Sequence, residues 1–297
     1  MLTAVLHSVA ILAGVGLVFA VFIALAYWKL RVWEDPRIDV VASMLPGANC
    51  GACGLPGCRG FAEHAVAGKI QPAACNVIDG GGAALIASYL GVDAGQANKR
   101  IARLLCAGGS NVAVQLAEYR GLPTCGAAAA VAGGGKGCAW GCLGFGDCAV
   151  SCTFGAITMN RFGLPVVDVN ACTACGDCVT ACPKNLFEII PLDQKLLVQC
   201  RSMIEGDEAL ESCAVACTAC GKCVIDAAPG LVTIERGSAR VHYELNALAD
   251  VSATSRCPTG AITWVEGRQF TTSAFTTSAS RLPALALSGS TGAGGSE

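Results

Sequence analysis

The chain has 297 residues, a formal net charge of −2, 20 cysteines and only 3 histidines. The nearly neutral charge gives no basic surface of the kind that binds nucleic acid, so we expect no nucleic-acid partner. The scarcity of histidine argues against mixed Cys/His zinc sites. So many cysteines indicate either the disulfides of a secreted scaffold or the metal centres of an intracellular protein.

Residues 1–30 are predicted to form a single transmembrane anchor in the lipid bilayer. Residues 9–28 carry no formal charge, and a helix of that length spans a bilayer. The start lacks the basic residues of a signal peptide, and no cleavage site follows. Lys29 and Arg31 come after the apolar stretch, and positive residues tend to stay in the cytoplasm. We therefore expect a single-pass anchor, with all residues after it on the cytoplasmic side of the membrane. The alternative, a buried helix of a soluble protein, would need covering segments that the sequence lacks.

Residues 31–80 are predicted to form a small four-cysteine module. Its spacing is Cys50-x2-Cys53-x4-Cys58-x16-Cys75, with glycines between the thiols. Glycine lets the backbone pass close to a metal group and turn its amides toward it. Four thiolates bind a [4Fe–4S] cluster, although the same residues could hold zinc. The cysteine runs farther along favour iron–sulfur, so these four residues make the first predicted cluster set.

Residues 136–192 are predicted to form a ferredoxin domain with two clusters. The two runs are Cys138-x3-Cys142-x5-Cys148-x3-Cys152 and Cys172-x2-Cys175-x2-Cys178-x3-Cys182-Pro183. The second run has the spacing and the proline of a bacterial ferredoxin, in which the fourth cysteine ligates the other cluster. The second predicted set is therefore Cys138, Cys142, Cys148 and Cys182, and the third is Cys152, Cys172, Cys175 and Cys178. A short apolar stretch follows each run and predicts a strand, which gives a pseudo-twofold ferredoxin fold.

Residues 193–268 are predicted to form a degenerate ferredoxin unit with one cluster. Cys217-x2-Cys220-x2-Cys223 supplies three ligands, but position 227 is Ala, and only Cys257 remains of the later run. Crossed ligation explains this pattern, because the losses then remove one whole cluster and leave the other complete. The fourth predicted set is Cys217, Cys220, Cys223 and Cys257.

Four [4Fe–4S] clusters use 16 of the 20 cysteines and leave Cys106, Cys125, Cys200 and Cys213. Cys106 and Cys125 lie in residues 81–135, a predicted spacer with short helices, and we interpret them as small buried residues. A bridge between them or an auxiliary metal site is the alternative. Cys213 could substitute as a ligand of the fourth cluster. Residues 269–297 are rich in Ser, Thr, Ala and Gly and are predicted to be disordered.

The predicted fold is thus α+β: a transmembrane helix, a four-cysteine module and two ferredoxin-like units, the second degenerate. The parts carry specific motifs, which are Glu34-Asp35-Pro36-Arg37, Leu45-Pro46-Gly47-Ala48-Asn49-Cys50-Gly51, Gly54-x-Pro56-Gly57-Cys58 and Gly141-Cys142-Leu143-Gly144-Phe145-Gly146-Asp147-Cys148. With these motifs the chain resembles the B subunits of Rnf-type ion-translocating electron transport complexes. The resemblance implies soluble ferredoxin and the other subunits of a membrane complex as partners. It also implies electron flow between ferredoxin and NAD, coupled to Na⁺ or H⁺ movement.

The function predicted from these features is that of a membrane-anchored iron–sulfur electron-transfer subunit. No acid–base or nucleophilic group of residues stands out, so no catalytic residue is expected. No dinucleotide fingerprint is present, so NAD and flavin are expected on other subunits. One alternative is a subunit of a membrane reductase that keeps a redox sensor reduced, and another is a structural zinc protein.

Overall fold

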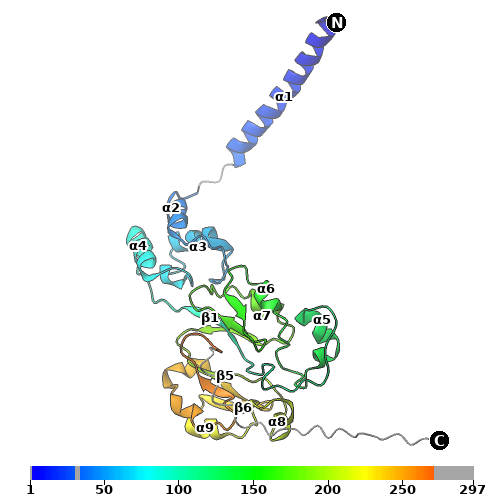
Figure 1. The fold of residues 1–297 in the computed structure, drawn as a ribbon. Coiled ribbons are helices and arrows are strands. Elements are labelled where there is room, and N and C mark those ends of the chain that lie inside the picture. Colours follow the sequence, from blue (N-terminus) through cyan, green and yellow to red (C-terminus); the bar gives the residue numbers. More distant parts are fainter. Residues whose placement is uncertain (1, 31–33, 271–297) are drawn as a thin grey trace, which may run out of the picture.

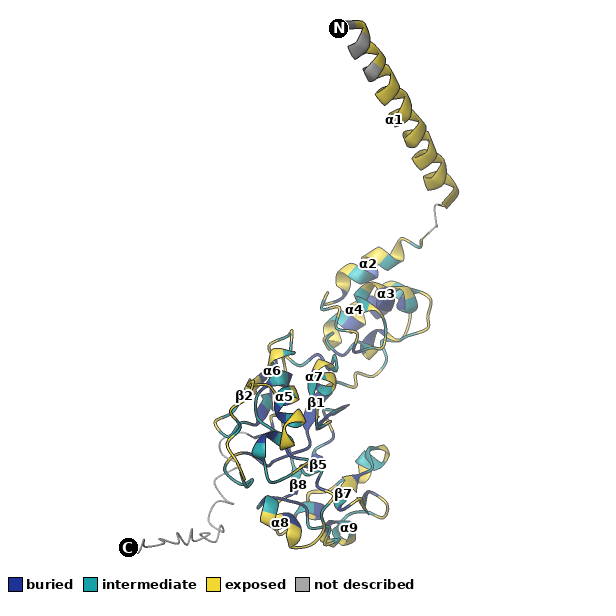
Figure 2. Cartoon of the chain, turned by 90° about the vertical axis from the view of Figure 1, so that its right-hand side faces the viewer, coloured by how far each residue is buried: buried dark blue, intermediate teal, exposed yellow. Residues whose placement is uncertain are grey.

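The computed structural model describes residues 2–30 and 34–270. The chain runs from one long helix through a small helical module into two mixed units of short strands and helices (Figure 1). The predicted disordered tail lies outside the described residues from position 271 onward. Figure 2 shows buried residues in the module and in both units, whereas the long helix is exposed along its length.

The first helix, α1 (Leu2–Leu30), contains the apolar segment that the sequence predicted as an anchor. Its span Val9–Leu30 covers 22 residues with a mean hydropathy of 2.8, and none of its hydropathy window is buried in the protein. A helix with apolar side chains on every face and no protein cover is suited to a lipid environment. In both views α1 extends away from the rest of the molecule (Figures 1 and 2).

The module after α1 is built from short helices around a small apolar core. Its elements are α2 (Arg37–Met44), α3 (Gly57–Val66), the 3₁₀ turn η1 (Pro72–Ala74) and α4 (Gly80–Leu90). Val41, Phe61 and Ile86 are fully buried between the three α-helices. The carboxylate of Asp79 caps α4 by accepting the Gly82 N–H at 2.6 Å, which satisfies one of the amides left free at a helix start.

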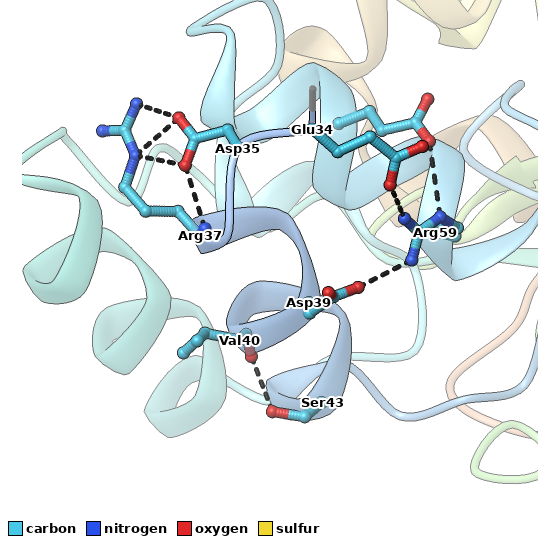
Figure 3. Close-up of polar contacts among 8 residues, drawn as sticks. Glu34, Asp35, Arg37, Asp39, Val40, Ser43 and Arg59 are labelled. Carbon is cyan, nitrogen blue, oxygen red and sulfur yellow. Dashed lines mark hydrogen bonds and ion pairs between the residues drawn. The ribbon is translucent and has the colours of Figure 1, made fainter. Parts of the chain in front are cut away.

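A group of charged residues joins the chain before α2 to α3 (Figure 3). Arg59 on α3 donates to Asp39 at 2.7 Å and to Glu34, and it lies 3.7 Å from Glu63. These side chains are about half exposed or more, so each ion pair adds little stability. Together they connect Glu34 and α2 to α3.

The first ferredoxin unit begins earlier than the predicted boundary at residue 136. Its elements are β1 (Arg100–Leu104), α5 (Cys125–Ala130), η2 (Ala132–Gly135), α6 (Asp147–Val150), β2 (Ile157–Met159), β3 (Pro165–Val167), α7 (Asp177–Ala181) and β4 (Phe187–Pro191). Strand β1 pairs antiparallel with β4, from Arg100 opposite Pro191 to Leu104 opposite Phe187, and β2 pairs with β3.

Strand β1 lies in the segment that the sequence analysis described as a spacer of short helices. Ile101, Ala102 and Leu104 are at most 1% exposed, because the strand contributes to the core of the unit. Residues 105–137 are therefore an insertion inside the unit, between its first strand and its first cysteine run. The Ala/Gly-rich part of that insertion forms α5 and η2.

The second unit repeats the strand plan of the first. Its elements are β5 (Leu196–Val198), α8 (Glu208–Ser212), α9 (Lys222–Asp226), β6 (Val232–Glu235), β7 (Ser238–Val241), η3 (Tyr243–Leu248), η4 (Val251–Thr254) and β8 (Ile262–Trp264). Strand β5 pairs antiparallel with β8, and β6 pairs with β7. In both units the first strand thus pairs with the last, and the two middle strands form a hairpin, as the predicted ferredoxin repeat requires.

The first residues of the predicted tail are part of the folded protein. Gln269 is 3% exposed, and its side-chain amide donates to the Leu104 carbonyl and accepts the Leu104 N–H, both at 3.0 Å. It thereby pairs with the open edge of β1 as a neighbouring strand would. Phe270 is buried in the core of the first unit. The folded part of the described chain therefore includes Gln269 and Phe270.

Candidate metal centres

The first module brings several of its cysteines close to one another, with Cys58 in the first turn of α3. Asn49 accepts the Cys58 N–H at 2.9 Å, and Gly57, at φ +79°, has no room for a side chain because a Cβ would lie 2.8 Å from the Asn49 Oδ1. Burial raises the pKa of Cys75, and the neighbouring thiols of Cys50 and Cys53 raise it further. Cys53, Cys58 and Cys75 also pack against the same core. Cys50 and Cys53 thus lie near Cys75, and Cys58 packs against the same core.

The three downstream runs present their thiols through the same backbone turn. A glycine with φ between +73° and +95° precedes α6, α7 and α9, at Gly146, Gly176 and Gly221. Two residues later a cysteine of each helix is buried, at Cys148, Cys178 and Cys223. The left-handed conformation is one that glycine adopts without strain, and it turns the helix start toward the centre of the loop.

The third predicted set lines one cavity, whose cysteines are Cys152, Cys172, Cys175 and Cys178. Three of them come from one run and one from the other, as crossed ligation requires. The Ala156 N–H donates to the Cys152 Sγ at 3.3 Å. Burial raises the pKa of Cys178 to about 12, with the neighbouring Cys172 and Cys175 adding to the effect. Deprotonating these thiols therefore needs a compensating positive charge such as cluster iron.

Arg103 on β1 supports a negatively charged group near this cavity. Its side chain is 1% exposed, and Nη1 donates to the Gly267 carbonyl at 2.6 Å. Its Nε and Nη2 have no hydrogen-bond partner among residues 2–30 and 34–270. Burial lowers the pKa of the Arg103 guanidinium, and the charge of Cys172 opposes that change. A buried cation beside thiolates fits the negative charge of a cluster with four cysteine ligands.

The second predicted set is only partly brought together. Three of its members, Cys142, Cys148 and Cys182, line one cavity, and the fourth cysteine of that cavity is Cys125. Cys138 instead lines a separate cavity with Cys106, Cys200 and Cys213. Burial is the main cause that raises the pKa of Cys148 to about 12, and the nearby thiols of Cys125 and Cys182 raise it further. All four leftover cysteines of the sequence analysis thus lie in cavities with other cysteines.

Asp147 holds Cys125 beside this cavity. Its two carboxylate oxygens accept the N–H groups of Cys125 and Gly126 at 2.8 and 3.0 Å, at the start of α5. Because Asp147 immediately precedes Cys148, the same contact joins the inserted helix to the cysteine run. An isolated cysteine in an inserted segment is therefore anchored to a ligand loop, which no spacing rule reveals.

The register of the two runs carried a signal that sequence reasoning missed. Cys142, Cys148 and Cys152 have the same spacing as Cys172, Cys178 and Cys182, so the place of Cys175 is taken by Phe145. The ring of Phe145 packs edge-on against Tyr119, with ring centroids 5.5 Å apart. Cys138 lies four residues before this register begins. The first run therefore supplies one ligand fewer to its loop than a count of cysteines suggests.

The fourth predicted set comes together across the second unit. Burial raises the pKa of Cys223 to about 11, and the nearby thiols Cys217, Cys257 and Cys220 raise it further. The Ala239 N–H donates to the Cys217 Sγ at 3.4 Å. Asp226 accepts from Arg256 through both oxygens, at 2.5 to 3.0 Å, so the helix of Cys223 is tied to the residue before Cys257. Cysteines far apart in the chain thus become neighbours.

The thiols of the first ferredoxin unit line cavities rather than converge on single points. In the described part of the chain, no three His, Cys, Asp or Glu side chains converge closely enough to hold one metal ion. A zinc ion needs four ligands at about 2.3 Å from one centre, whereas a [4Fe–4S] cluster fills the space between its ligands. The donor set, thiolate throughout, fits the cluster.

Two family models match the chain. The model described as "Putative Fe-S cluster" matches residues 45–77, and the model described as "4Fe-4S dicluster domain" matches residues 138–187. The first range contains the cysteines of the helical module, and the second contains both runs of the first ferredoxin unit. The chain therefore carries an iron–sulfur module and a 4Fe–4S dicluster domain.

Curated relatives cover most of the chain. The B subunit of the Na(+)-translocating ferredoxin:NAD(+) oxidoreductase complex of Acetobacterium woodii is 43% identical over 244 residues, 82% of this chain and 73% of that protein. The B subunit of the proton-translocating ferredoxin:NAD(+) oxidoreductase complex of Clostridium ljungdahlii is 34% identical, and the match covers 87% of this chain and 92% of that protein. The B subunit of the ion-translocating oxidoreductase complex of Methanosarcina acetivorans is also 34% identical, over 88% of this chain and 99% of that protein.

Proposed function

Because the chain belongs to the family of B subunits of Rnf-type ion-translocating oxidoreductase complexes, we propose that it exchanges electrons with soluble ferredoxin and relays them to partner subunits toward NAD. It works as an electron carrier without a catalytic acid or base. A bound [4Fe–4S] cluster supplies a one-electron site whose potential depends on charge, hydrogen bonds and solvent access. The chain's own residues set those three properties.

The observation that carries this proposal is the series of cysteine quartets from the helical module to the second unit. We propose cluster binding at Cys50, Cys53, Cys58 and Cys75, at Cys152, Cys172, Cys175 and Cys178, and at Cys217, Cys220, Cys223 and Cys257. We propose a further cluster at Cys142, Cys148 and Cys182. The sequence predicts Cys138 as its fourth ligand, whereas the fourth cysteine of this cavity is Cys125.

Backbone amides and buried cations tune these sites. The N–H groups of Ala156, Leu186 and Ala239 donate to cysteine sulfurs at 3.3 to 3.4 Å. Each such contact withdraws charge from a thiolate, which favours the reduced state of a cluster. Arg103 acts in the same direction through its buried charge.

We further propose that α1 spans the cytoplasmic membrane of a bacterium once and that the cysteine-bearing units lie on the cytoplasmic side. The support is the exposed apolar span Val9–Leu30 and the positive residue Lys29 at its end. Soluble ferredoxin would then reach the clusters without crossing the bilayer. Protease digestion of right-side-out and inverted vesicles tests this orientation, because only inverted vesicles should lose the cysteine-bearing units.

The proposal of electron exchange is tested on the full chain, purified in detergent without oxygen. Mixing with chemically reduced ferredoxin should bleach the broad visible absorption of the chain and produce the paramagnetic signals of reduced [4Fe–4S] clusters. A control with oxidised ferredoxin should change neither. An iron-free chain, or one whose metal is mainly zinc, would overturn the electron-transfer function. Clusters that dithionite reduces but ferredoxin does not would overturn ferredoxin as the partner.

A further inference from the structure

We propose that Cys106, Cys138, Cys200 and Cys213 bind a fifth [4Fe–4S] cluster between the two ferredoxin units, and that Cys125 completes the neighbouring set of Cys142, Cys148 and Cys182. The inference deepens the proposed function and rests on it, because it adds one more redox site to the same series. It starts from the cavity that these four cysteines line.

Cys106 and Cys200 occupy equivalent positions in the two units. Each lies two residues after the first strand of its unit, β1 or β5. The residue between strand and cysteine makes the same contact in both: the Leu105 N–H donates to Leu186 at 2.8 Å, and the Gln199 N–H donates to Ala261 at 2.7 Å.

A direct hydrogen bond joins these two strand ends. The Ala107 N–H donates to the Gln199 carbonyl at 2.9 Å, so the residue after Cys106 is bonded to the residue before Cys200. The ferredoxin repeat itself therefore brings one thiol from each unit to the boundary between them.

Cys213 and Cys138 reach the same cavity through the inserted segment. The backbone of Cys213 pairs with that of Ala113 in an isolated antiparallel β-bridge. The Ala214 N–H donates to the Val112 carbonyl, and the Val114 N–H donates to the Ser212 carbonyl. The other side of this strand-like stretch pairs with the chain just before Cys138, where the Gly137 N–H donates to Val114 at 2.9 Å. The insertion thus places two cysteines that are distant in sequence on either side of one extended segment.

The cavity matches the two ferredoxin cavities in size and in its sulfur donors. Each of the three cavities encloses about 20 Å³, and each is lined by four cysteines. Cys106 and Cys213 are 7% and 6% exposed. Clusters of this type take four cysteine thiolates, so these four cysteines offer a cluster the same ligands as the two sets of the first unit do.

Backbone amides donate to the sulfurs of this set as they do in the ferredoxin sets. The Cys142 N–H donates to the Cys106 Sγ at 3.3 Å, and the Ser202 N–H lies 3.5 Å from the Cys200 Sγ. The corresponding distances at Cys152, Cys182 and Cys217 are 3.3 to 3.4 Å. Hydrogen bonds of this kind stabilise thiolate ligands of a cluster.

Lys136 supplies a positive charge at the cavity wall. Its ammonium group donates to the carbonyl oxygens of Gly108 and Cys142, both at 2.5 Å, which holds the charge inside the protein. A lysine turned inward needs negative charge nearby to offset its loss of water. Four thiolates around a cluster provide that charge.

The site connects parts of the molecule that the first four sets leave apart. The Cys142 N–H contact reaches the neighbouring cavity of the first unit, and Cys200 packs against the cores of both units. With Cys125 in the neighbouring set, all 20 cysteines belong to quartets. The degenerate second unit then remains connected to the first despite its missing cluster.

The first test counts clusters in the unsubstituted chain. Full-length protein purified in detergent without oxygen should contain about 20 iron and 20 sulfide per chain, because each four-cysteine set holds four of each. Native mass spectrometry of the same sample should give the mass of five clusters. Four clusters with or without one zinc ion would overturn the proposal and leave the proposed function standing. A chain without iron would overturn both.

The second test uses pairs of substitutions. Removing two ligands of the same cluster should cost no more iron than removing one, whereas removing ligands of two clusters should cost both clusters. The double variant Cys106→Ala/Cys213→Ala should lose about four iron, the same as either single variant. The double variant Cys138→Ala/Cys142→Ala should lose about eight, because its two residues belong to different clusters. Cys125→Ala should lose about four, and Ser110→Ala, an exposed change in the same insertion, should lose none.

The opposite results are equally clear. Full iron content in Cys106→Ala/Cys213→Ala, or a loss of only about four iron in Cys138→Ala/Cys142→Ala, would overturn the proposal. Electron paramagnetic resonance of the remaining clusters monitors folding, because a variant that keeps the other signals has kept its structure. If a variant loses every cluster through misfolding, the mass of the unsubstituted chain still decides between four clusters and five.

Discussion

The two ferredoxin units share one strand plan but differ in what fills the space between their loops. The first unit has two cysteine-lined cavities, and each contains cysteines from both of its runs. In the second, position 227 is Ala and residues 243–254 form η3 and η4, whose Leu245, Ala249 and Ala253 pack into the core. Apolar side chains thus replace a cluster, and the strand pairing of the ferredoxin plan persists without it.

Some features of the two units depend on neighbouring residues, and others depend on contacts between distant segments. Both units turn through a left-handed glycine before a buried cysteine, at Gly176 and Gly221. Only the first carries the insertion 105–137 between its first strand and its first run. That insertion pairs with the second unit at Ala113 and Cys213, so the two units are joined through the very segment in which they differ.

The largest expected effect concerns the crossed ligand of the second unit. Replacing Cys257 with Ala should remove the cluster at Cys217, Cys220 and Cys223, a loss of about four iron, while the first unit keeps its clusters. Iron and sulfide analysis with electron paramagnetic resonance measures this, and the exposed change Ser255→Ala serves as control. If the cluster survived, the second unit would not follow the crossed arrangement of the first.

The second prediction compares the hairpin turns of the two units. A Cβ at Gly237 would lie 2.5 Å from the Met203 carbonyl oxygen, whereas a Cβ at Gly163 would meet nothing closer than 3.5 Å, at the Gly144 Cα. Both glycines have positive φ, so alanine costs about 1 kcal/mol at either site from backbone strain. The added clash should raise the loss of unfolding free energy in Gly237→Ala to about 2–4 kcal/mol.

Guanidinium denaturation followed by the loss of cluster absorption measures the difference between the two glycine variants. Gly237→Ala should lower the guanidinium concentration at the unfolding midpoint of the second unit. This shift should be clearly larger than the one that Gly163→Ala causes in the first unit. Equal shifts would mean that the second hairpin is not held against Met203, and the two turns would then be equivalent.

The third prediction concerns the buried cation that the first unit has at β1. Arg103→Met removes a charge near Cys172 and should lower the potential of that cluster by on the order of 50–120 mV, equivalent to about 1–3 kcal/mol at an effective dielectric constant of about 20. The potential of the second unit's cluster should change much less.

A redox titration followed by electron paramagnetic resonance gives both potentials in the Arg103→Met variant. Arg161→Met removes the same charge at an exposed site of the first unit and should leave the potential near its original value, because water screens exposed charges. Equal shifts in the two variants would show that the burial of Arg103 has no special effect.

The smallest expected effect is at the ion pair of the second unit. The hydrogen bond from Arg256 lowers the pKa of Asp226 below its ordinary value. The stabilisation is therefore fully present above the unfolded pKa of about 3.9 and is lost as the pH falls through the lower folded value. Asp226→Asn should slightly speed cluster release from the second unit at neutral pH, and the difference from the unsubstituted chain should vanish in acid.

Iron release into a chelator, measured over a pH series, tests the Asp226 prediction. Asp250→Asn is a control with the same charge change, because the Asp250 side chain accepts hydrogen bonds within its own turn, such as that from the Ser252 N–H, and forms no ion pair with an arginine of the described chain. A faster release in both variants would mean that loss of an acidic charge, and not the link between the two halves of the ligand set, is responsible.

Much of the candidate site follows from spacing along the chain. The run from Cys172 to Cys182 and the run from Cys217 to Cys223 each present their thiols through one tight loop, so local sequence predicts the chemistry of that loop. The apolar anchor α1 is likewise a property of consecutive residues. The start of the first unit at Arg100 was missed, because β1 is a short apolar stretch that becomes a strand only by pairing with the distant β4.

The sequence by itself determined the kind of ligand, the repeated ferredoxin loops and the anchor, because each depends on neighbours a few residues apart. Only the tertiary structure decided the surroundings of Cys106, Cys125, Cys138, Cys200 and Cys213. Their positions depend on the pairing of β1 with β4 and of β5 with β8, and on the insertion that runs between the two units. Such contacts join residues far apart in the chain, and the packing that selects them belongs to the whole fold.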